Sequence, residues 1–359
     1  MLFSSALAAL AISASTATAL VTPRTPTARS PCGKCKHKLQ RKAWHTLTVE
    51  EKQAYIDAEL CLMNKPATLG LPGARNRFEE LQSIHQVQSS IIHGVGAFLP
   101  YHRLHMYAHE QLLRNECGYR GAQPWWDETR DAGKFTQSEV LDPLTGFGGD
   151  GVGSSGCIVD GPFANFTNAL GPGYWIGDSC INRFVNDSVS VMAGQEYLDF
   201  CARKQSFLEF WPCAELCPHR SGHGAIGGKL LDAVASPGDP LFYLHHTWLD
   251  KVFWDWQVLD LPARLTDMGG RLVQLPRGTP PDPPEPGAEV GPPEVRPAPF
   301  AFPPADSLVP VDSPFQVPEG DPGNVTTLTH ILNMIGVIPN ATIADVMDIG
   351  GPLLCYEYV

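Results

Sequence analysis

Six of the histidines in this sequence fall into two groups whose spacing limits the folds that the chain can adopt. The groups are His85, His93 and His102, and His219, His223 and His246. His219 and His223 are four residues apart, so on an α-helix their imidazoles lie on one face, one turn apart. Two facing sets of three imidazoles inside a helical bundle form a dinuclear metal site. On spacing alone, ordinary buried histidines in a helical protein remain the alternative interpretation.

A metal held only by imidazole nitrogens belongs to a limited chemical class. Such ligands suit copper, zinc, nickel or iron, and they disfavour magnesium and calcium, which prefer oxygen. The metal-site interpretation therefore predicts a mainly α fold with a four-helix-bundle core, in which two ions of this class lie between the helices.

Apolar periodicity, together with capping and breaking residues, predicts several helices. Residues 40–64 contain an entry segment and a helix, with Thr48 and Glu51 as a capping box. Gly94, Gly96 and Pro100 separate the second and third helices. After the first helix, the expected helical ranges are 75–93, 101–117, 190–212, 219–232 and 246–257. Residues 140–180 are rich in Gly, Asn and Ser and are expected to form a long irregular loop.

Composition divides the chain into four parts. Residues 2–14 are apolar and precede Ala17-Thr18-Ala19, which predicts a signal peptide over 1–19. Residues 20–275 form the predicted metal-binding domain. Residues 276–318 contain 15 prolines in 43 positions and are expected to form an extended linker or surface wrap. Residues 319–359 form a short tail that is expected to dock back on the domain.

The cysteines, the glycosylation motifs and the net charge indicate in which compartment the protein works and which classes of partner it is not expected to bind. The chain has ten cysteines, which mostly pair in an oxidising compartment, and Cys32 and Cys35 are expected in structural disulfides, with each other or with distant partners. Four N-x-S/T motifs, at Asn165, Asn186, Asn324 and Asn340, agree mildly with export. The net charge of −12 argues against nucleic acid and anionic membrane surfaces as partners.

The residues around the histidines carry a resemblance to a known family. His93 is followed by Phe98-Leu99-Pro100-Tyr101-His102-Arg103 and, eight residues after His102, by Glu110. The segment 239–246, DPLFYLHH, is followed by Asp250. Both motifs resemble those of the tyrosinase family of type-3 copper proteins, which includes catechol oxidases and haemocyanins. Tyr101 departs from the usual Trp or Phe. The ending PNATIADVMDIGGPLLCYEY resembles that of short secreted fungal members.

The resemblance implies a role for each matching residue. His85, His93 and His102 would bind the first copper, and His219, His223 and His246 the second. His245 would lie beside the substrate without binding metal. Glu215 matches a carboxylate that orients water near the coppers in many members, and it would accept a phenolic proton. His105 and His109 are expected to pack on their helix, while Arg103, Glu110 and Asp250 are expected to form ion pairs or hydrogen bonds.

Three departures from the family refine the expected chemistry. Ile91 stands where many members carry a cysteine that forms a thioether to histidine, so no thioether is expected. Arg220 stands where hydroxylating members often have Asn, which favours oxidation of o-diphenols or aminophenols over hydroxylation of monophenols. Gly224 is expected to leave the metal face open to a bulky substrate. The tail is too short for the C-terminal domain that covers the site in longer members.

The expected function is therefore that of a secreted copper oxidase. Its partners would be O₂ and a small phenolic substrate that becomes an o-quinone, in pigment or secondary-metabolite biosynthesis. Two alternatives remain. One is a haemocyanin-like zinc enzyme that rearranges a small alkaloid in the manner of a cyclopenase, since His₃ sites bind zinc well. The other is a haemocyanin-like reversible O₂ carrier.

Overall fold

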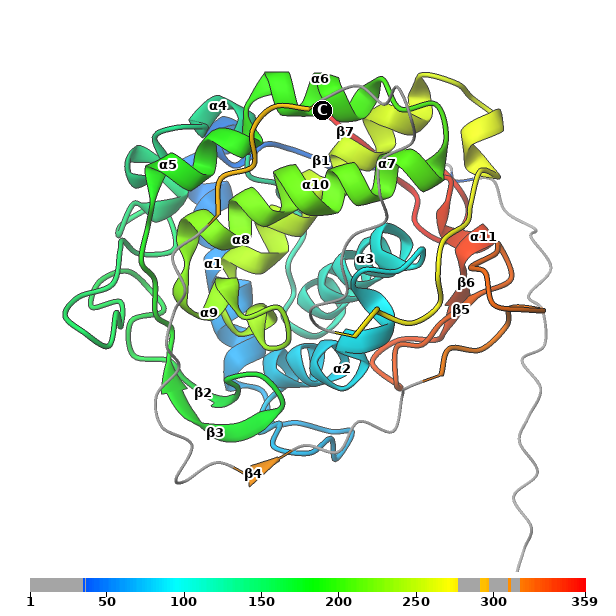
Figure 1. The fold of residues 1–359 in the computed structure, drawn as a ribbon. Coiled ribbons are helices and arrows are strands. Elements are labelled where there is room, and N and C mark those ends of the chain that lie inside the picture. The colour runs from blue at the N-terminus through cyan, green and yellow to red at the C-terminus, as the bar shows by residue number, and fades with distance from the viewer. Residues whose placement is uncertain (1–34, 36, 277–290, 297–308, 311–316) are drawn as a thin grey trace, which may run out of the picture. The chain divides into compact units, whose positions relative to one another are not determined.

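The computed structural model describes residues 35, 37–276, 291–296, 309–310 and 317–359 (Figure 1). These residues belong to one compact unit, Lys34–Val359. The predicted signal peptide, Cys32 and most of the proline-rich stretch 276–318 lie outside the described residues.

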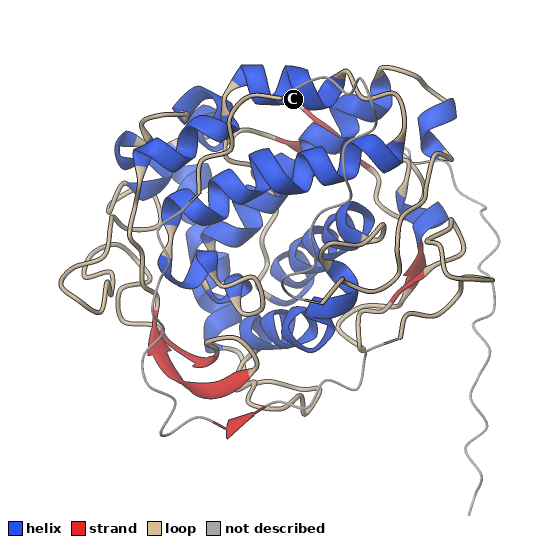
Figure 2. Cartoon of the chain, in the orientation of Figure 1, coloured by secondary structure: helices blue, strands red, loops and turns tan. Residues whose placement is uncertain are grey.

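The described chain is mainly helical, which confirms the predicted fold class (Figure 2). The helices are α1 Val49–Asn64, α2 Arg77–Ile92, α3 Phe98–Glu116, α4 Glu128–Asp131, α5 Asp187–Ser190, α6 Gln195–Ala202, α7 Phe207–Ala214, α8 Arg220–Ile226, α9 Gly228–Leu231, α10 Leu241–Val258 and α11 Ile343–Val346. A π-helical turn, Glu215–His219, joins α7 to α8. In the central bundle, α3 contacts both α2 and α10, and α10 contacts α7 and the π-helical turn.

Three helix boundaries differ from those expected. The third helix begins at Phe98 and not at residue 101, because Pro100 lies in its first turn, where a missing N–H is tolerated. The last helix of the bundle begins at Leu241, five residues before His246. The expected helix over 190–212 is broken into shorter pieces, which include α6 and α7. The capping box of α1 is confirmed, with Thr48 and Glu51 exchanging hydrogen bonds of 2.9 and 3.2 Å.

The strands within the described ranges form three small sheets. Their bounds are β1 Leu39–Arg41, β2 Thr167–Leu170, β3 Trp175–Cys180, β4 Val309–Pro310, β5 Ile331–Leu332, β6 Ala341–Thr342 and β7 Tyr356–Tyr358. β2, β3 and β4 pair antiparallel, as do β5 and β6, whereas β1 and β7 pair in parallel. The prediction that 140–180 is wholly irregular is wrong, because β2 and β3 form an antiparallel hairpin within this range. The disulfide Cys157–Cys180 joins the hairpin to the loop that precedes it.

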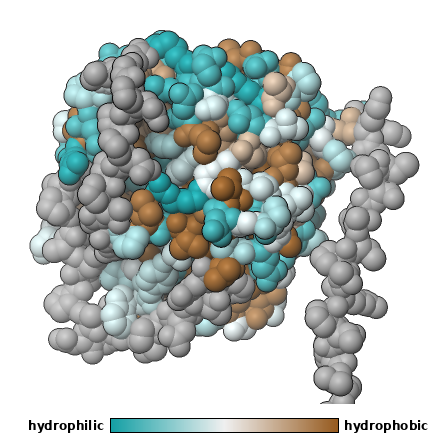
Figure 3. All heavy atoms as spheres, turned by 45° about the vertical axis from the view of Figure 1, so that its right-hand side comes forward, coloured by the Kyte–Doolittle hydropathy of each residue, from teal (hydrophilic) through white to brown (hydrophobic). Residues whose placement is uncertain are grey.

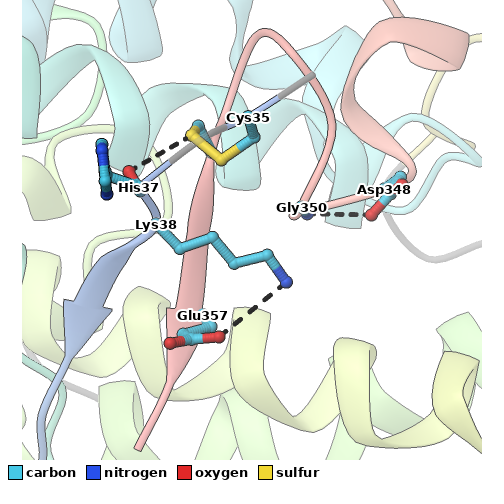
Figure 4. The surroundings of a disulfide bond; sticks show 7 residues. Cys35, His37, Lys38, Asp348, Gly350 and Glu357 are labelled. Atoms are coloured by element: carbon cyan, nitrogen blue, oxygen red, sulfur yellow. Dashed lines mark hydrogen bonds and ion pairs between the residues drawn. A yellow bond between two sulfur atoms is a disulfide. The ribbon is translucent and has the colours of Figure 1, made fainter.

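The tail lies against the start of the helical unit. Leu39 pairs with Tyr356 and Arg41 with Tyr358 in the parallel ladder. Cys35 forms a disulfide with Cys355, 320 residues away, and Lys38 lies 3.8 Å from Glu357 (Figure 4). Cys35 therefore pairs with a distant partner. Two further disulfides, Cys61–Cys117 and Cys201–Cys213, leave Cys217 as the free cysteine of the described residues.

A buried ionic network joins the tail to the bundle. Arg103 of α3 donates to Asp250 of α10, and Arg41 of β1 lies 2.8 Å from Glu110 and 3.5 Å from Asp250. Arg103 also donates to the backbone oxygens of residues 346 and 347 in the tail, at 3.0 Å each. Tyr356 donates its hydroxyl to Asp250. The expected pairing of Arg103, Glu110 and Asp250 is confirmed, and it fixes the two helices that carry His102 and His246.

The surface shows no unusual apolar concentration on the face drawn in Figure 3, as far as its described residues are concerned. Apolar side chains lie there in small groups among polar ones, which is normal for a protein surface. Among the described residues, no helix combines the length and the apolar character that crossing a bilayer would require.

Candidate metal centre

The first histidine group comes together at the junction of α2 and α3. His85 lies within α2, His93 is the C-cap residue of that helix, and His102 lies on α3, one turn from its start. All three side chains are buried, and their candidate ligand nitrogens lie within 4.8 Å of one another. The Nε2 atoms of His85 and His102 are 3.4 Å apart.

The second group is formed by the π-helical turn, α8 and α10. His219, His223, His245 and His246 place their candidate nitrogens within 4.8 Å of one another. The Nε2 atoms of His223 and His246 are 3.1 Å apart. The two groups face each other, since the rings of His102 and His246 stack with centroids 4.4 Å apart and an interplanar angle of 15°. The structure thus brings all six predicted histidines into one centre.

Backbone carbonyls orient five of these six rings. The Nδ1 contacts are His85 to Val234 O at 2.9 Å, His93 to Ser89 O at 3.0 Å, His102 to Phe98 O at 2.8 Å, His219 to Glu215 O at 3.1 Å, and His223 to Leu230 O. A carbonyl only accepts hydrogen bonds, so Nδ1 carries the proton and Nε2 keeps its lone pair. In three cases the carbonyl belongs to residue i−4, so the local helix orients the ring. For His85 and His223 the carbonyl comes from the segment after Gly227. Gly227 has a φ of +72°, which glycine adopts without strain, and at this residue α8 ends and the chain turns into α9.

Electrostatics keep the imidazoles neutral, which is the form that binds metal. Burial lowers the pKa of His93 to about 4, opposed by its bond to the Ser89 carbonyl. Burial, followed by the neighbouring histidines, also lowers the pKa of His85 and His102 well below the usual value. Two unprotonated Nε2 atoms at 3.4 Å then direct lone pairs at the same small volume. A soft-to-borderline cation such as copper or zinc would relieve that repulsion, so the residues fit the metal that the sequence predicts.

His245 and His246 are adjacent in sequence but have different surroundings. His245 Nδ1 lies 2.6 Å from Oε1 of Glu128, and both side chains are fully buried. Among the described residues, His246 Nδ1 has no hydrogen-bond partner, while its Nε2 faces His223. Sequence reasoning did not find Glu128, because it lies outside both motifs and 117 residues from His245. A carboxylate beside a histidine at a metal centre fixes the ring orientation.

Glu215 lies at the edge of the centre, beside the first histidine group. Its Oε1 accepts a 2.7 Å hydrogen bond from the backbone N–H of Gly94, the residue that follows His93. Burial raises the pKa of Glu215 to about 8, and the Gly94 hydrogen bond and the charges of Arg220 and Arg271 oppose this shift. The carboxyl group is thus held near the histidines by one backbone amide.

The remaining predicted neighbours lie outside the two groups. His105 Nε2 lies 3.1 Å from the Leu81 carbonyl, and His109 lies between Glu59 and Gln123 at 2.9 Å from each. Both rings are buried and belong to the packing around the bundle, as expected. Ile91 is buried in the apolar core.

Gly222 allows α8 to lie against the His245–Glu128 pair. A Cβ at this position would lie 2.2 Å from His245 Nδ1 and 2.9 Å from Glu128 Oε1. We expect Gly222→Ala to displace this pair, to lower the free energy of unfolding by about 1–3 kcal/mol through overpacking, and to weaken metal binding. Thermal unfolding and metal titration measure both effects. Gly323→Ala is the matched control, since no atom of the part of the chain that the structure describes lies within 4 Å of the added Cβ. Equal effects of the two variants would contradict the close contact.

The comparisons with known proteins agree with the site. The family described as the common central domain of tyrosinase matches residues 75–259, which contain both histidine groups. A helical bundle with two facing sets of imidazoles, together with this match, defines a type-3 dicopper protein. The chain belongs to the tyrosinase family.

Individual relatives extend the match along most of the chain. The tyrosinase-like protein phomQ1 of Diaporthe leptostromiformis is 30% identical over 355 residues, covering 92% of this chain and 80% of its own. The tyrosinase-like protein phomQ2 of the same fungus is 32% identical over 255 residues, covering 67% of this chain and 64% of its own, so the match spans less than two thirds of phomQ2. A polyphenol oxidase from Thermothelomyces thermophila superposes with a TM-score of 0.71 at 26% identity, covering 90% and 89% of the two chains.

Proposed function

We propose that the protein is a secreted copper-dependent oxidase that converts o-diphenols or aminophenols to o-quinones or quinone imines with O₂, in pigment or secondary-metabolite biosynthesis. The observation that carries the proposal is the pair of facing histidine groups with Nε2 lone pairs directed inward. Similarity to a polyphenol oxidase over 90% of the chain supports the reaction class. Tyrosinase-like relatives named phomQ1 and phomQ2 support a fungal setting.

The proposed ligand sets follow the geometry. His85, His93 and His102 would hold one copper, and His219, His223 and His246 the other. His245 is assigned beside the site, because Glu128 holds its Nδ1 while the ring of His246 stacks on His102. Bound copper would supply the redox chemistry of the overall reaction, in which two diphenols and one O₂ give two quinones and two waters.

The protein's own residues orient the reactants and accept protons. A phenol binds a cationic centre better as a phenolate, so a nearby base accelerates the reaction. Glu215 is proposed as that base, because its carboxyl group lies beside the histidines and is held by the Gly94 amide. The centroid of the Phe98 ring lies 4.7 Å from that of His219 and 4.8 Å from that of His102, so an apolar ring contacts one histidine of each group.

We expect Glu215→Gln to lower kcat about 10²- to 10⁴-fold for an o-diphenol, because the amide cannot accept the phenolic proton. The metal content is expected to stay at two coppers per chain, since no predicted ligand changes. Stopped-flow oxidation of 4-methylcatechol and elemental analysis measure the two quantities. Glu319→Gln, at an exposed position of the tail, is the control. Unchanged kcat in Glu215→Gln would remove Glu215 from the mechanism.

The proposed function is tested first by elemental analysis of the secreted protein and by O₂ consumption with 4-methylcatechol. Two coppers per chain and catechol-dependent O₂ uptake support it. Zinc without copper, and no O₂ uptake after copper loading, would contradict it and favour the zinc alternative. Reversible oxygenation with no catechol turnover would favour the O₂ carrier.

Export is proposed from the sequence and from the disulfides. Four disulfides in the described residues are consistent with an oxidising compartment. Asn165, Asn324 and Asn340 of the glycosylation motifs are exposed, whereas Asn186 is partly buried and caps α5.

A further inference from the structure

Part of the proline-rich stretch is docked on the helical unit near the metal centre. We call residues 291–296 the docked segment. Tyr197 of α6 donates its hydroxyl to the Pro293 carbonyl at 2.7 Å. The backbone N–H of Val295 donates to Met192 Sδ at 3.2 Å, and the Val295 side chain packs against the hydrophobic core. Two backbone contacts and one apolar side chain therefore hold this segment in place.

His219 lies nearest to the surface of the two histidine groups, although its Nε2 atom is buried. Among the seven clustered histidines, His219 alone is partly exposed and the other six are buried. The side of His219, where α8 begins with Arg220, is therefore the side from which we expect a substrate to approach. Glu215, four residues before His219, accepts a hydrogen bond from the backbone N–H of Gly94, the residue after His93. Arg220 follows His219 directly in the chain, and we call this edge of the centre the rim.

The docked segment places one carboxylate between two arginines at this rim. Arg220 Nη1 donates to Glu294 Oε1, and Arg296 Nε lies 3.8 Å from the same oxygen. The side chains of Arg220 and Glu294 are 35% and 36% exposed. An ion pair with that much exposure contributes little net free energy, because water solvates the separated charges well. Another carboxylate can therefore replace Glu294 without leaving a buried charge unpaired.

We propose that Arg220 and Arg296 bind the carboxylate of an anionic phenolic substrate, and that Glu294 occupies this position in the ligand-free protein. The inference rests on the proposed function, and it narrows the substrate class to o-diphenols that carry a carboxylate on a short side chain. A guanidinium binds carboxylates through directed hydrogen bonds, which a neutral substituent cannot replace. Glu294 thus competes with acidic substrates and leaves neutral ones unaffected.

Competition between Glu294 and a substrate carboxylate for Arg220 lets the docked segment weaken the binding of acidic substrates only. The anchors at Tyr197 and Val295 lie outside the ion pair, so the Glu294 side chain can rotate away while the segment stays docked. Arg220 then becomes available to the substrate carboxylate while the phenolic ring reaches the centre beside His219. Glu294 acts as a specificity-determining residue through Arg220 and touches no reacting atom.

The test compares 3-(3,4-dihydroxyphenyl)propionic acid with its methyl ester, which differ at the carboxylate. The quantity measured is the ratio of KM for the acid to KM for the ester, with copper-loaded protein. We expect Glu294→Gln to lower this ratio about five- to tenfold and Arg220→Gln to raise it by a similar factor. Glu357→Gln is the control, because Glu357 also forms a partly exposed ion pair, with Lys38. A ratio that stays within twofold in both Glu294→Gln and Arg220→Gln overturns the inference.

A binding measurement separates this inference from the proposed function. Isothermal calorimetry with 3-phenylpropionate, which cannot be oxidised to a quinone, reports carboxylate binding without turnover. We expect tighter binding to Glu294→Gln and weaker binding to Arg220→Gln than to the unmodified protein. If no diphenol is oxidised, the proposed function fails while this order of affinities still supports the carboxylate site. Equal affinities in all three proteins, with the ester oxidised normally, contradict the carboxylate site alone.

Discussion

Replacing His93 or His246 with alanine is expected to remove about one metal ion per chain and to abolish oxidation. Each side chain belongs to a different histidine group, so each loss leaves two of the three proposed ligands of one copper. Loss of one metal removes several kcal/mol of transition-state stabilisation, which corresponds to about a thousandfold or more in rate. Elemental analysis and O₂ uptake with 4-methylcatechol measure the two effects.

His330→Ala is the control for both variants. His330 is buried as well, but it lies in the tail, where its Nδ1 contacts Asp321 at 2.5 Å. It belongs to neither histidine group, so two metals are expected to remain bound. Two metals per chain in His93→Ala or in His246→Ala would refute the ligand assignment for that residue.

Replacing Asp250 with alanine is expected to give the largest loss of stability, about 3–5 kcal/mol in the free energy of unfolding. The side chain of Asp250 is 2% exposed and lies between Arg41 and Arg103, which are fully buried. Its removal leaves two buried guanidinium groups near each other with one fewer carboxylate, and the hydroxyl of Tyr356 loses its acceptor. Chemical denaturation monitored by tryptophan fluorescence measures the change.

Asp255→Ala, on the same helix, is the matched control. Asp255 pairs with Lys251 at 2.6 Å, but its side chain is 57% exposed. Removal of an exposed pair of this kind changes the free energy of unfolding by about 0.5 kcal/mol or less. If Asp250→Ala were as stable as Asp255→Ala, the buried network could not be what fixes α3 against α10.

The ionic network around Asp250 also links the stability of the fold to metal binding. Arg103 and Asp250 lie on the helices that carry His102 and His246, and the rings of these two histidines stack across the centre. A change at Asp250 is therefore expected to weaken metal binding as well. The backbone oxygens of residues 346 and 347 contribute to the same network, so the tail supports the site from outside it.

Whether a feature could be predicted from the sequence depended largely on how far apart in the chain its interacting residues lie. The capping box at Thr48 was predictable because it joins residues three apart. The hairpin of β2 and β3 was not, because the composition of 140–180 gives no alternation of apolar and polar residues that marks a strand. The helix start at Phe98 was misplaced because proline is tolerated in a first turn as well as between helices.

The sequence by itself indicated the family, the mainly helical fold and the six histidines that cluster in the structure, because the motifs around His102 and His246 are short and local. The i−4 carbonyls that orient His93, His102 and His219 are also a consequence of local helix geometry. The tertiary structure alone decided the contacts of His245 with Glu128, of His85 with the Val234 carbonyl and of Arg220 with Glu294. Each of these joins residues 74 to 149 positions apart, and only the packing of the folded chain brings such residues within hydrogen-bonding distance.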